Sequence, residues 1–120
     1  MCGIVGFYSK TGAPAPHEPL WGGLTDSLAH RGPDDGAYWG DGPFFLGHRR
    51  LSIIGLETGA QPMPSADGRY VIAFNGEIYN HCELRKTLQA HGCEFRTDAD
   101  TEVLLHGYQR WGTDLPKHLT

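Results

Sequence analysis

The apolar run at the start of the chain is the feature that most constrains the fold. Residues 2–8, CGIVGFY, predict a buried strand that begins at the terminus itself. Residues 37–41 (AYWGD) and 43–50 (PFFLGHRR) predict two further strands, which a tight turn at Gly42 joins. Such strand pairs are antiparallel, and this favours an α+β fold over a doubly wound one.

Helical and extended patterns mix along the rest of the chain. Leu20, Leu24 and Leu28 recur every four residues, with Trp21 beside them, and this predicts a helix with one apolar face despite two internal glycines. Residues 69–74, RYVIAF, predict a strong strand. Because no regular βαβ alternation is visible, an α+β fold with antiparallel strands is expected.

The last third of the sequence predicts two helices. Asn80 begins the first, Glu83 completes a capping box, and Gly92 ends the helix. The second runs from about Asp100 and stops at Gly112. One face of this second helix is expected to carry Val103, Leu104, Tyr108 and Trp111. The segment 113–120 shows no closing element, so we expect a piece of a longer protein.

Composition limits the class of protein. Glycine occupies 17 of 120 positions, so many residues serve turns and close backbone approaches. The length allows one domain at most. A net charge of -4 without a basic run argues against nucleic acid or acidic lipid as partner. Neither a membrane span nor a secretory signal is visible. Three cysteines do not suit a disulfide framework, and a cytoplasmic location is the simplest interpretation.

A cysteine in second position suggests a specific chemistry. We expect Met1 to be removed, because the next side chain is small, and Cys2 then carries a free α-amine beside its thiol. An α-amine titrates close to neutral pH, so one residue supplies both a nucleophile and a base. Position alone favours an ordinary small residue that opens a buried strand, because buried inert cysteines are common.

Six short motifs favour the catalytic interpretation. In chain order they are CGIVGF (2–7), HRGPD (30–34), HRRLSI (48–53), GAQP (59–62), NGEIYN (75–80) and DTEVLL (100–105). Together they resemble the class II glutamine amidotransferase domain of asparagine synthetases, which belongs to the N-terminal-nucleophile hydrolases. HRRLSI and FNGEIYN favour this group over the hexosamine, purine-pathway and glutamate-synthase relatives. The resemblance extends from residue 2 to about residue 112.

The resemblance implies a fold and a domain. The expected fold is a four-layer α-β-β-α sandwich with antiparallel sheets, and 120 residues are too few to complete it. Residues 1–120 are therefore expected to be the N-terminal part of a type 2 glutamine amidotransferase domain. ATP and magnesium are expected only in a synthetase domain that this chain lacks, since no phosphate-cradling glycine loop is visible. The chain itself is expected to hold no cofactor.

The resemblance assigns catalysis to Cys2, Asn75 and Gly76. Cys2 would attack the side-chain amide of glutamine, release ammonia and leave a thioester that water hydrolyses to glutamate. The Asn75 amide and the Gly76 N–H would form the oxyanion hole, where losing one donor typically costs roughly 10²–10³ in rate. Asn-Gly is also a strong hairpin signal. Here, however, it leads into a helix rather than a returning strand.

Substrate clamps follow from the same resemblance. Arg50 is expected to bind the α-carboxylate of glutamine, because the family pattern places its arginine directly before LSI. Arg49 is adjacent, and on a strand the two neighbours point to opposite faces. The backbone of the next four residues is expected to line the same site: Leu51, Ser52, Ile53 and Ile54.

Two carboxylates are expected to hold the α-ammonium of glutamine. These are Glu77 and Asp100, with Asp98 as a competitor that the motif DTEVLL disfavours. Either aspartate is equally suited to capping the helix that follows. No role is assigned to the loop HRGPDD (30–35), for which a Gly-Pro turn is a sufficient interpretation.

Metal binding and thiol-protease chemistry find little support. His81, Cys82, His91 and Cys93 match no common zinc spacing, so no metal site is expected. Cys82 is expected to face a core together with Leu84. A thiol protease would need a histidine partner for its cysteine, and no histidine has a family-specific context.

Three functions remain open. The leading hypothesis is a glutaminase domain that supplies ammonia to a C-terminal synthetase domain for ATP-dependent asparagine synthesis from aspartate. The second is a class II amidotransferase that serves another acceptor, such as a sugar, an antibiotic precursor or a peptide. The third is a non-catalytic remnant that binds glutamine or only dimerises. A second copy of the chain is a further candidate partner.

Overall fold

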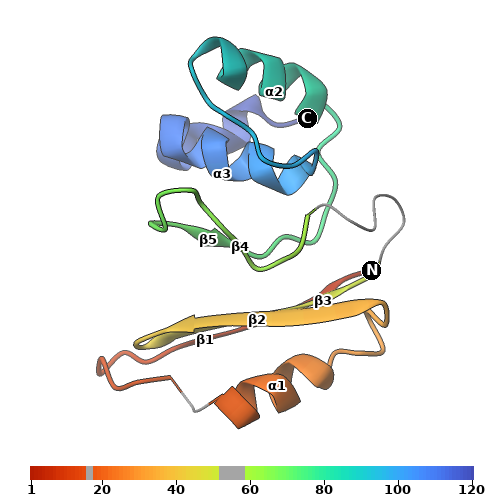
Figure 1. Ribbon diagram of the computed structural model, residues 1–120, viewed down its shortest axis with the longest axis vertical. Coiled ribbons are helices and arrows are strands. Elements are labelled where there is room, and N and C mark those ends of the chain that lie inside the picture. Colours follow the sequence, from red (N-terminus) through yellow and green to blue (C-terminus); the bar gives the residue numbers. More distant parts are fainter. Residues whose placement is uncertain (16–17, 52–58) are drawn as a thin grey trace. The chain divides into compact units, whose positions relative to one another are not determined.

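The computed structural model describes residues 1–15, 18–51 and 59–120, and they divide into two compact units (Figure 1). The first unit contains the described residues up to Leu51, together with Ala60–Pro62 and Ala73–Asn75. The second contains Gly59, Met63–Ile72 and Gly76–Thr120.

The first unit is an antiparallel sheet with a helix on one face. The strands β1 (Gly3–Tyr8), β2 (Asp35–Asp41) and β3 (Phe44–Arg50) are arranged in the order β1-β3-β2. The turn between β2 and β3 contains Gly42, whose φ of 52° favours glycine. α1 (Glu18–Asp26) covers one face of the sheet (Figure 1). The terminal strand, the hairpin and the antiparallel pairing are confirmed.

The helix face that packs on the sheet differs from the predicted leucine face. The Trp21 ring stacks on Phe45, with centroids 5.3 Å apart, and Thr25 is buried beside Gly47. Leu20 is exposed. Glycines on the sheet decide this, because a Cβ at Gly40 would overlap the Trp21 ring. The bulky ring fills space that only glycine leaves open, so Trp21 packs on the sheet and Leu20 does not, whereas Leu24 and Leu28 are half-buried.

The first strand is less buried than predicted. Gly3 is buried, but Ile4, Phe7 and Tyr8 are all exposed. β1 is an edge strand, and α1 covers only one face of the sheet in the described residues. The prediction of a strand is therefore confirmed, whereas the prediction of its burial is wrong.

The second unit combines two helices with a short hairpin and a 3₁₀ helix (Figure 1). Its elements are β4 (Met63–Pro64), β5 (Val71–Ile72), α2 (His81–Ala90), α3 (Asp100–Trp111) and η1 (Gly112–His118). Both predicted helices are confirmed, and each is followed by a glycine with positive φ, Gly92 and Gly112. Its core is formed by Ile78, Leu84, Leu88, Val103, Leu104, Leu105 and Leu115.

Three local predictions in this part of the chain differ from the structure. The strand expected over residues 69–74 pairs only at Val71–Ile72, because the Phe74 N–H and carbonyl bond the side chains of Gln61 and His48 rather than a neighbouring strand. Tyr108, expected on one face with Val103, Leu104 and Trp111, is exposed, although its ring lies edge-on to Tyr70 at 5.5 Å. Cys82 is exposed although Leu84 is buried, since residues two apart on a helix do not share a face.

The capping box at the start of α2 is absent. Asn80 precedes the helix as predicted, but its side chain makes no capping hydrogen bond. Its Nδ2 instead donates to the His118 carbonyl at 2.8 Å, and its Oδ1 accepts from the Thr120 N–H at 3.1 Å. Asn80 thus joins the start of α2 to the end of η1. This 3₁₀ helix was not expected from the sequence.

No helix among the described residues has the length and apolar character needed to cross a membrane. Nor do residues 1–15, 18–51 and 59–120 bring together three His, Cys, Asp or Glu side chains in a group suited to a metal ion.

Candidate functional site

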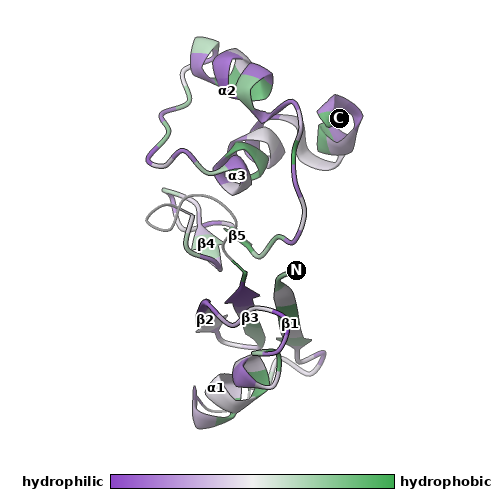
Figure 2. Cartoon of the chain, turned by 90° about the vertical axis from the view of Figure 1, so that its right-hand side faces the viewer, coloured by the Kyte–Doolittle hydropathy of each residue, from purple (hydrophilic) through white to green (hydrophobic). Residues whose placement is uncertain are grey.

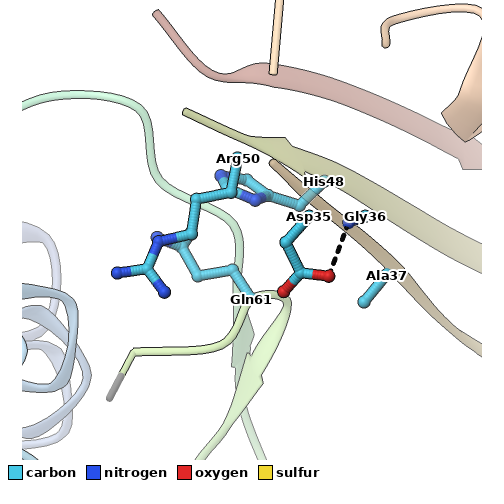
Figure 3. Close-up of a pocket in the computed structure, with 6 residues that line it drawn as sticks. All are labelled: Asp35, Gly36, Ala37, His48, Arg50 and Gln61. Atoms are coloured by element: carbon cyan, nitrogen blue, oxygen red, sulfur yellow. Dashed lines mark hydrogen bonds between the residues drawn. The ribbon is translucent and has the colours of Figure 1, made fainter. Parts of the chain in front are cut away.

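Polar residues gather at the end of β3, on the sheet face opposite α1. Strand alternation puts His48 and Arg50 on the same face. In β2, Ala37 pairs with His48 and Asp35 pairs with Arg50. These four residues and Gln61 line a narrow hollow (Figure 3). The end of β3 is coloured as hydrophilic in Figure 2. The first unit therefore has a polar hollow built on three adjacent segments.

The two neighbouring arginines have different environments. Arg49 donates from Nε to the Gly32 carbonyl at 2.9 Å and forms an ion pair with Asp26 at 3.3 Å. These contacts lie on the α1 side of the sheet. Arg50 instead lines the hollow on the opposite side (Figure 3). The structure therefore gives Arg49 a role in binding α1 and the following loop to the sheet.

Cys2 lies at the same end of the sheet as Arg50. It precedes Gly3, whose partner in β3 is Arg49, so the antiparallel register places Cys2 in one row with Arg50 and Asp35. Cys2 is half-buried, and its carbonyl accepts a long hydrogen bond from the Arg31 Nε at 3.5 Å. The nucleophile predicted from sequence and the predicted carboxylate-binding arginine thus belong to neighbouring strands.

The HRGPDD loop, which had no predicted role, packs against the backbone of this strand end. Gly32 is buried, and a Cβ at this position would overlap the Arg49 carbonyl. The Asp34 N–H donates to the Arg50 carbonyl at 3.1 Å. With its contact to Cys2, the loop supports the backbone of both predicted site residues. A glycine is required at position 32 because no side chain fits there.

The residue before Asn75 is hydrogen-bonded through both of its backbone polar groups. The Phe74 N–H donates to the Gln61 Oε1 at 2.5 Å. The Phe74 carbonyl accepts from the His48 Nε2 at 3.2 Å. Both partners belong to the first unit, as do Phe74 and Asn75. Asn75 itself is exposed.

The pKa of the His48 imidazole is lowered from its usual value. The side chain is buried, and burial lowers its pKa. The bond to the Phe74 carbonyl and the charge of Asp35 oppose this, whereas Arg50 lowers the pKa further, and the net shift is downward. A neutral ring that donates through Nε2 carries its single proton there. His48 was not predicted as a site residue, although its period-two spacing from Arg50 is visible in the sequence.

Asp100, one of the two predicted ligands of the substrate's ammonium group, is hydrogen-bonded to the backbone within the second unit. Its Oδ2 accepts from the Ile78 N–H at 3.3 Å, and Ile78 is buried. Because Ile78 directly follows Glu77, this bond brings α3 against the segment that carries Glu77. The residue that caps α3 is Ala99, and α3 has no side-chain capping bond, so the capping interpretation of Asp98 or Asp100 was wrong. Gly76 and Glu77 are exposed.

The loop that leads into Asp100 is held by two charged residues. Arg85 donates to the Thr97 carbonyl at 2.8 Å and to the Ala99 carbonyl at 3.0 Å. The buried Glu102 carboxylate accepts from the N–H groups of Arg96 and Thr97 and from the Thr97 hydroxyl, at 2.8, 2.7 and 2.6 Å. Sequence analysis missed both residues, because their partners are loop backbone groups rather than a motif.

Stability of this unit is expected to depend on the charge of Glu102. Burial raises its pKa, but the bonds from Thr97 and Arg96, with His106 nearby, outweigh it, so the folded pKa lies below the usual value. A lowered carboxyl pKa stabilises the fold above about pH 4.3, and this stabilisation is lost as the pH falls further. Glu102→Gln is expected to lower the free energy of unfolding by about 2 kcal/mol at pH 7.

Urea unfolding at several pH values tests this expectation. The variant's stability should depend less on pH below about 4 than that of the wild type. Glu94→Gln, at an exposed position in the same unit, is the control and should behave like the wild type. Equal pH dependence in Glu102→Gln and wild type would contradict the assignment.

The predicted backbone contacts of residues 51–54 are only partly described. Leu51 directly follows β3 and is half-buried. Ser52, Ile53 and Ile54 lie outside the described residues.

Comparisons with known proteins identify relatives over the whole chain. A family model described as a glutamine amidotransferase domain matches residues 1–120. The glutamine-hydrolyzing asparagine synthetase 3 of Bacillus subtilis is 41% identical over 99% of this chain and 20% of the relative. Asparagine synthetase 1 of the same organism is 47% identical over 92% of this chain and 18% of the relative. A putative asparagine synthetase of Mycobacterium tuberculosis is 39% identical over 99% of this chain. The chain spans about a fifth of the length of these relatives.

Proposed function

Because the chain belongs to the glutamine amidotransferase domain family over residues 1–120, we propose that it hydrolyses the side-chain amide of glutamine to glutamate and ammonia. The observation that carries this proposal is the family match over residues 1–120. This range includes all of the predicted site residues, from Cys2 to Asp100. The row formed by Cys2, Arg50 and Asp35 at one end of the sheet is consistent with it.

Cys2 is the proposed nucleophile, with its own α-amine as base once Met1 is removed. The amine takes the thiol proton as sulfur attacks the amide carbon, and passes it to the leaving nitrogen, which departs as ammonia. The resulting thioester is hydrolysed by water, which releases glutamate and restores the thiol. The Asn75 amide and the Gly76 N–H stabilise the oxyanion that forms in each half of the reaction.

The substrate's charged groups are proposed to bind oppositely charged side chains. Arg50 binds the α-carboxylate, because its planar guanidinium can donate two parallel hydrogen bonds to a carboxylate. Glu77 and Asp100 bind the α-ammonium. The Ile78–Asp100 hydrogen bond supports this pairing, since it joins the segments that carry the two carboxylates. Leu51, Ser52, Ile53 and Ile54 contribute backbone contacts.

The acceptor of the ammonia is proposed from the relatives. The two Bacillus subtilis relatives are named glutamine-hydrolyzing asparagine synthetases and are about five times as long as this chain. We therefore assign the ammonia to ATP-dependent synthesis of asparagine from aspartate by a C-terminal synthetase domain, which would also hold ATP and magnesium. A reducing cytoplasm, where Cys2 stays a free thiol, is the compartment that this chemistry needs.

The proposed fold is that of the N-terminal-nucleophile hydrolases, a four-layer α-β-β-α sandwich. The described residues form a mixed arrangement of helices and antiparallel sheet, which supports an α+β class. A sheet with α1 on one face and exposed Ile4, Tyr8 and Phe44 supports a further layer on the other side.

Covalent labelling tests the function directly. A glutamine-like alkylating analogue is added to the full natural chain, and intact-mass and peptide mass spectrometry locate the adduct. The expected result is a product without Met1 that carries one adduct on Cys2, and excess glutamine should prevent its formation. A folded, processed chain that takes no adduct at Cys2 would rule out the proposed mechanism.

A further inference from the structure

We propose that His48 and Gln61 are positioning residues that hold Asn75 in place as an oxyanion donor. This inference rests on the proposed function, because it assigns a role to two residues through a third that the proposal makes catalytic. Neither His48 nor Gln61 is proposed to contact the reacting atoms. Their role is to fix the peptide from which Asn75 extends.

The hydrogen bonds on Phe74 carry the argument. His48 donates to its carbonyl at 3.2 Å, and Gln61 accepts from its N–H at 2.5 Å. A residue whose N–H and carbonyl are both held by side chains has little freedom in φ and ψ. Asn75 is the next residue, so the same two bonds determine the direction in which its backbone and side chain leave Phe74.

The His48 bond to Phe74 starts from β3, the strand that also positions Cys2. His48 lies in the central strand β3, where it pairs with Ile4 of β1 and Ala37 of β2. The same strand carries Arg50 two residues on, and its register sets the position of Cys2. A bond from β3 to Phe74 therefore places the segment before Asn75 relative to the strand that places Cys2. All of these residues belong to one compact unit.

The chemistry of the two side chains suits this task. Burial lowers the pKa of His48, which favours a ring that donates one hydrogen bond without adding a second positive charge beside Arg50. The Gln61 amide oxygen is a neutral acceptor, and the residue lines the same hollow (Figure 3). Geometry matters for rate, because a misplacement of about 1 Å at a catalytic group can cost roughly 10²-fold.

Two pairs of substitutions distinguish the loss of a hydrogen bond to Phe74 from the mere replacement of the side chain. His48→Leu removes the donor, whereas His48→Gln retains an amide N–H near the Nε2 position. Gln61→Met removes the acceptor at similar length, whereas Gln61→Glu retains an acceptor oxygen. The Leu and Met variants are expected to lower kcat for glutamine hydrolysis by about 10- to 100-fold, with KM changed by less than about threefold. The Gln and Glu variants should recover most of that loss.

A double-mutant cycle with Asn75→Ala is the decisive test. If the two residues act through Asn75, adding His48→Leu or Gln61→Met to Asn75→Ala should lower kcat by less than about twofold. Circular dichroism and the rate of Cys2 alkylation by iodoacetamide, which needs no oxyanion donor, check that each variant is folded with an intact nucleophile. Gln61→Met keeps the test available if His48→Leu does not fold.

The outcomes distinguish this inference from the proposed function. Both the proposed function and the positioning role are supported by three results together. The wild type hydrolyses glutamine, Asn75→Ala lowers kcat strongly, and the losses of kcat do not add in the double variants. Wild-type hydrolysis with fully additive losses, or with normal kcat in His48→Leu and Gln61→Met, overturns the positioning role alone. A folded wild-type chain that neither hydrolyses glutamine nor reacts at Cys2 overturns the proposed function and this inference together.

Discussion

Cys2→Ala is expected to lower the rate of glutamine hydrolysis by about 10⁴-fold or more, the effect of removing a nucleophile that forms a covalent intermediate. Alanine keeps the α-amine and the small side chain at the start of β1, so the sheet should be unaffected. Cys2 is only half-buried, and its hydrogen bond with Arg31 is made by its backbone carbonyl, which alanine retains. Ammonia release at saturating glutamine measures the effect.

Cys82→Ala is the matched control for this prediction. Cys82 is exposed on α2, outside the proposed catalytic set, and its loss should leave hydrolysis within about twofold of the wild type. Comparable activity in Cys2→Ala and wild type would eliminate the covalent mechanism. A comparable loss in both cysteine variants would mean that the assay reports a general sensitivity of the protein to cysteine replacement.

Arg50→Ala is expected to raise KM for glutamine by roughly 10²-fold, because it removes a charged, bidentate partner of the α-carboxylate. The value of kcat should fall much less, since the carboxylate is bound equally in the ground and transition states. Arg50→Lys should recover only part of the affinity, because an ammonium group cannot donate two parallel hydrogen bonds. Steady-state kinetics over a wide range of glutamine concentrations measure both constants.

The neighbouring Arg49→Ala separates substrate binding from stability. Arg49 contacts the Gly32 carbonyl and Asp26 on the α1 side, so its loss should lower the free energy of unfolding by about 1–2 kcal/mol. Asp26 is largely exposed, and the ion pair itself therefore contributes little. KM of the folded variant should remain within about threefold of wild type. A greater rise of KM in Arg49→Ala than in Arg50→Ala would reverse the assignment of the two arginines.

The elements of the fold were predicted where the pattern is local. The hairpin around Gly42 and the helices that end at Gly92 and Gly112 follow from short-range periodicity and from glycines that adopt positive φ. Burial was predicted less well. Trp21, not Leu20, packs on the sheet, because the space that receives it is left by Gly40, nineteen positions later in the sequence.

Side-chain roles that depend on distant backbone were not predictable. Asn80 has the sequence signature of a capping residue, yet its amide binds the His118 carbonyl and the Thr120 N–H at the far end of the chain. Glu102 lies in the motif DTEVLL, from which no role was predicted for it, yet its carboxylate accepts hydrogen bonds from the loop that precedes Asp100. A polar side chain bonds whichever groups the fold brings close to it, and sequence spacing does not reveal them.

The amino-acid sequence alone determined the family, the identity of the candidate nucleophile Cys2 and the order of the strands β1 to β3 and the helices α1 to α3, because motifs and periodicity are properties of neighbouring residues. The tertiary structure decided which polar groups meet. His48 and Gln61 reach Phe74 across 26 and 13 positions of chain, and only the folded sheet and its adjoining segments bring them together. The physical reason is that a buried polar group must find a hydrogen-bonding partner, and the fold, not the local sequence, decides which partner lies within reach.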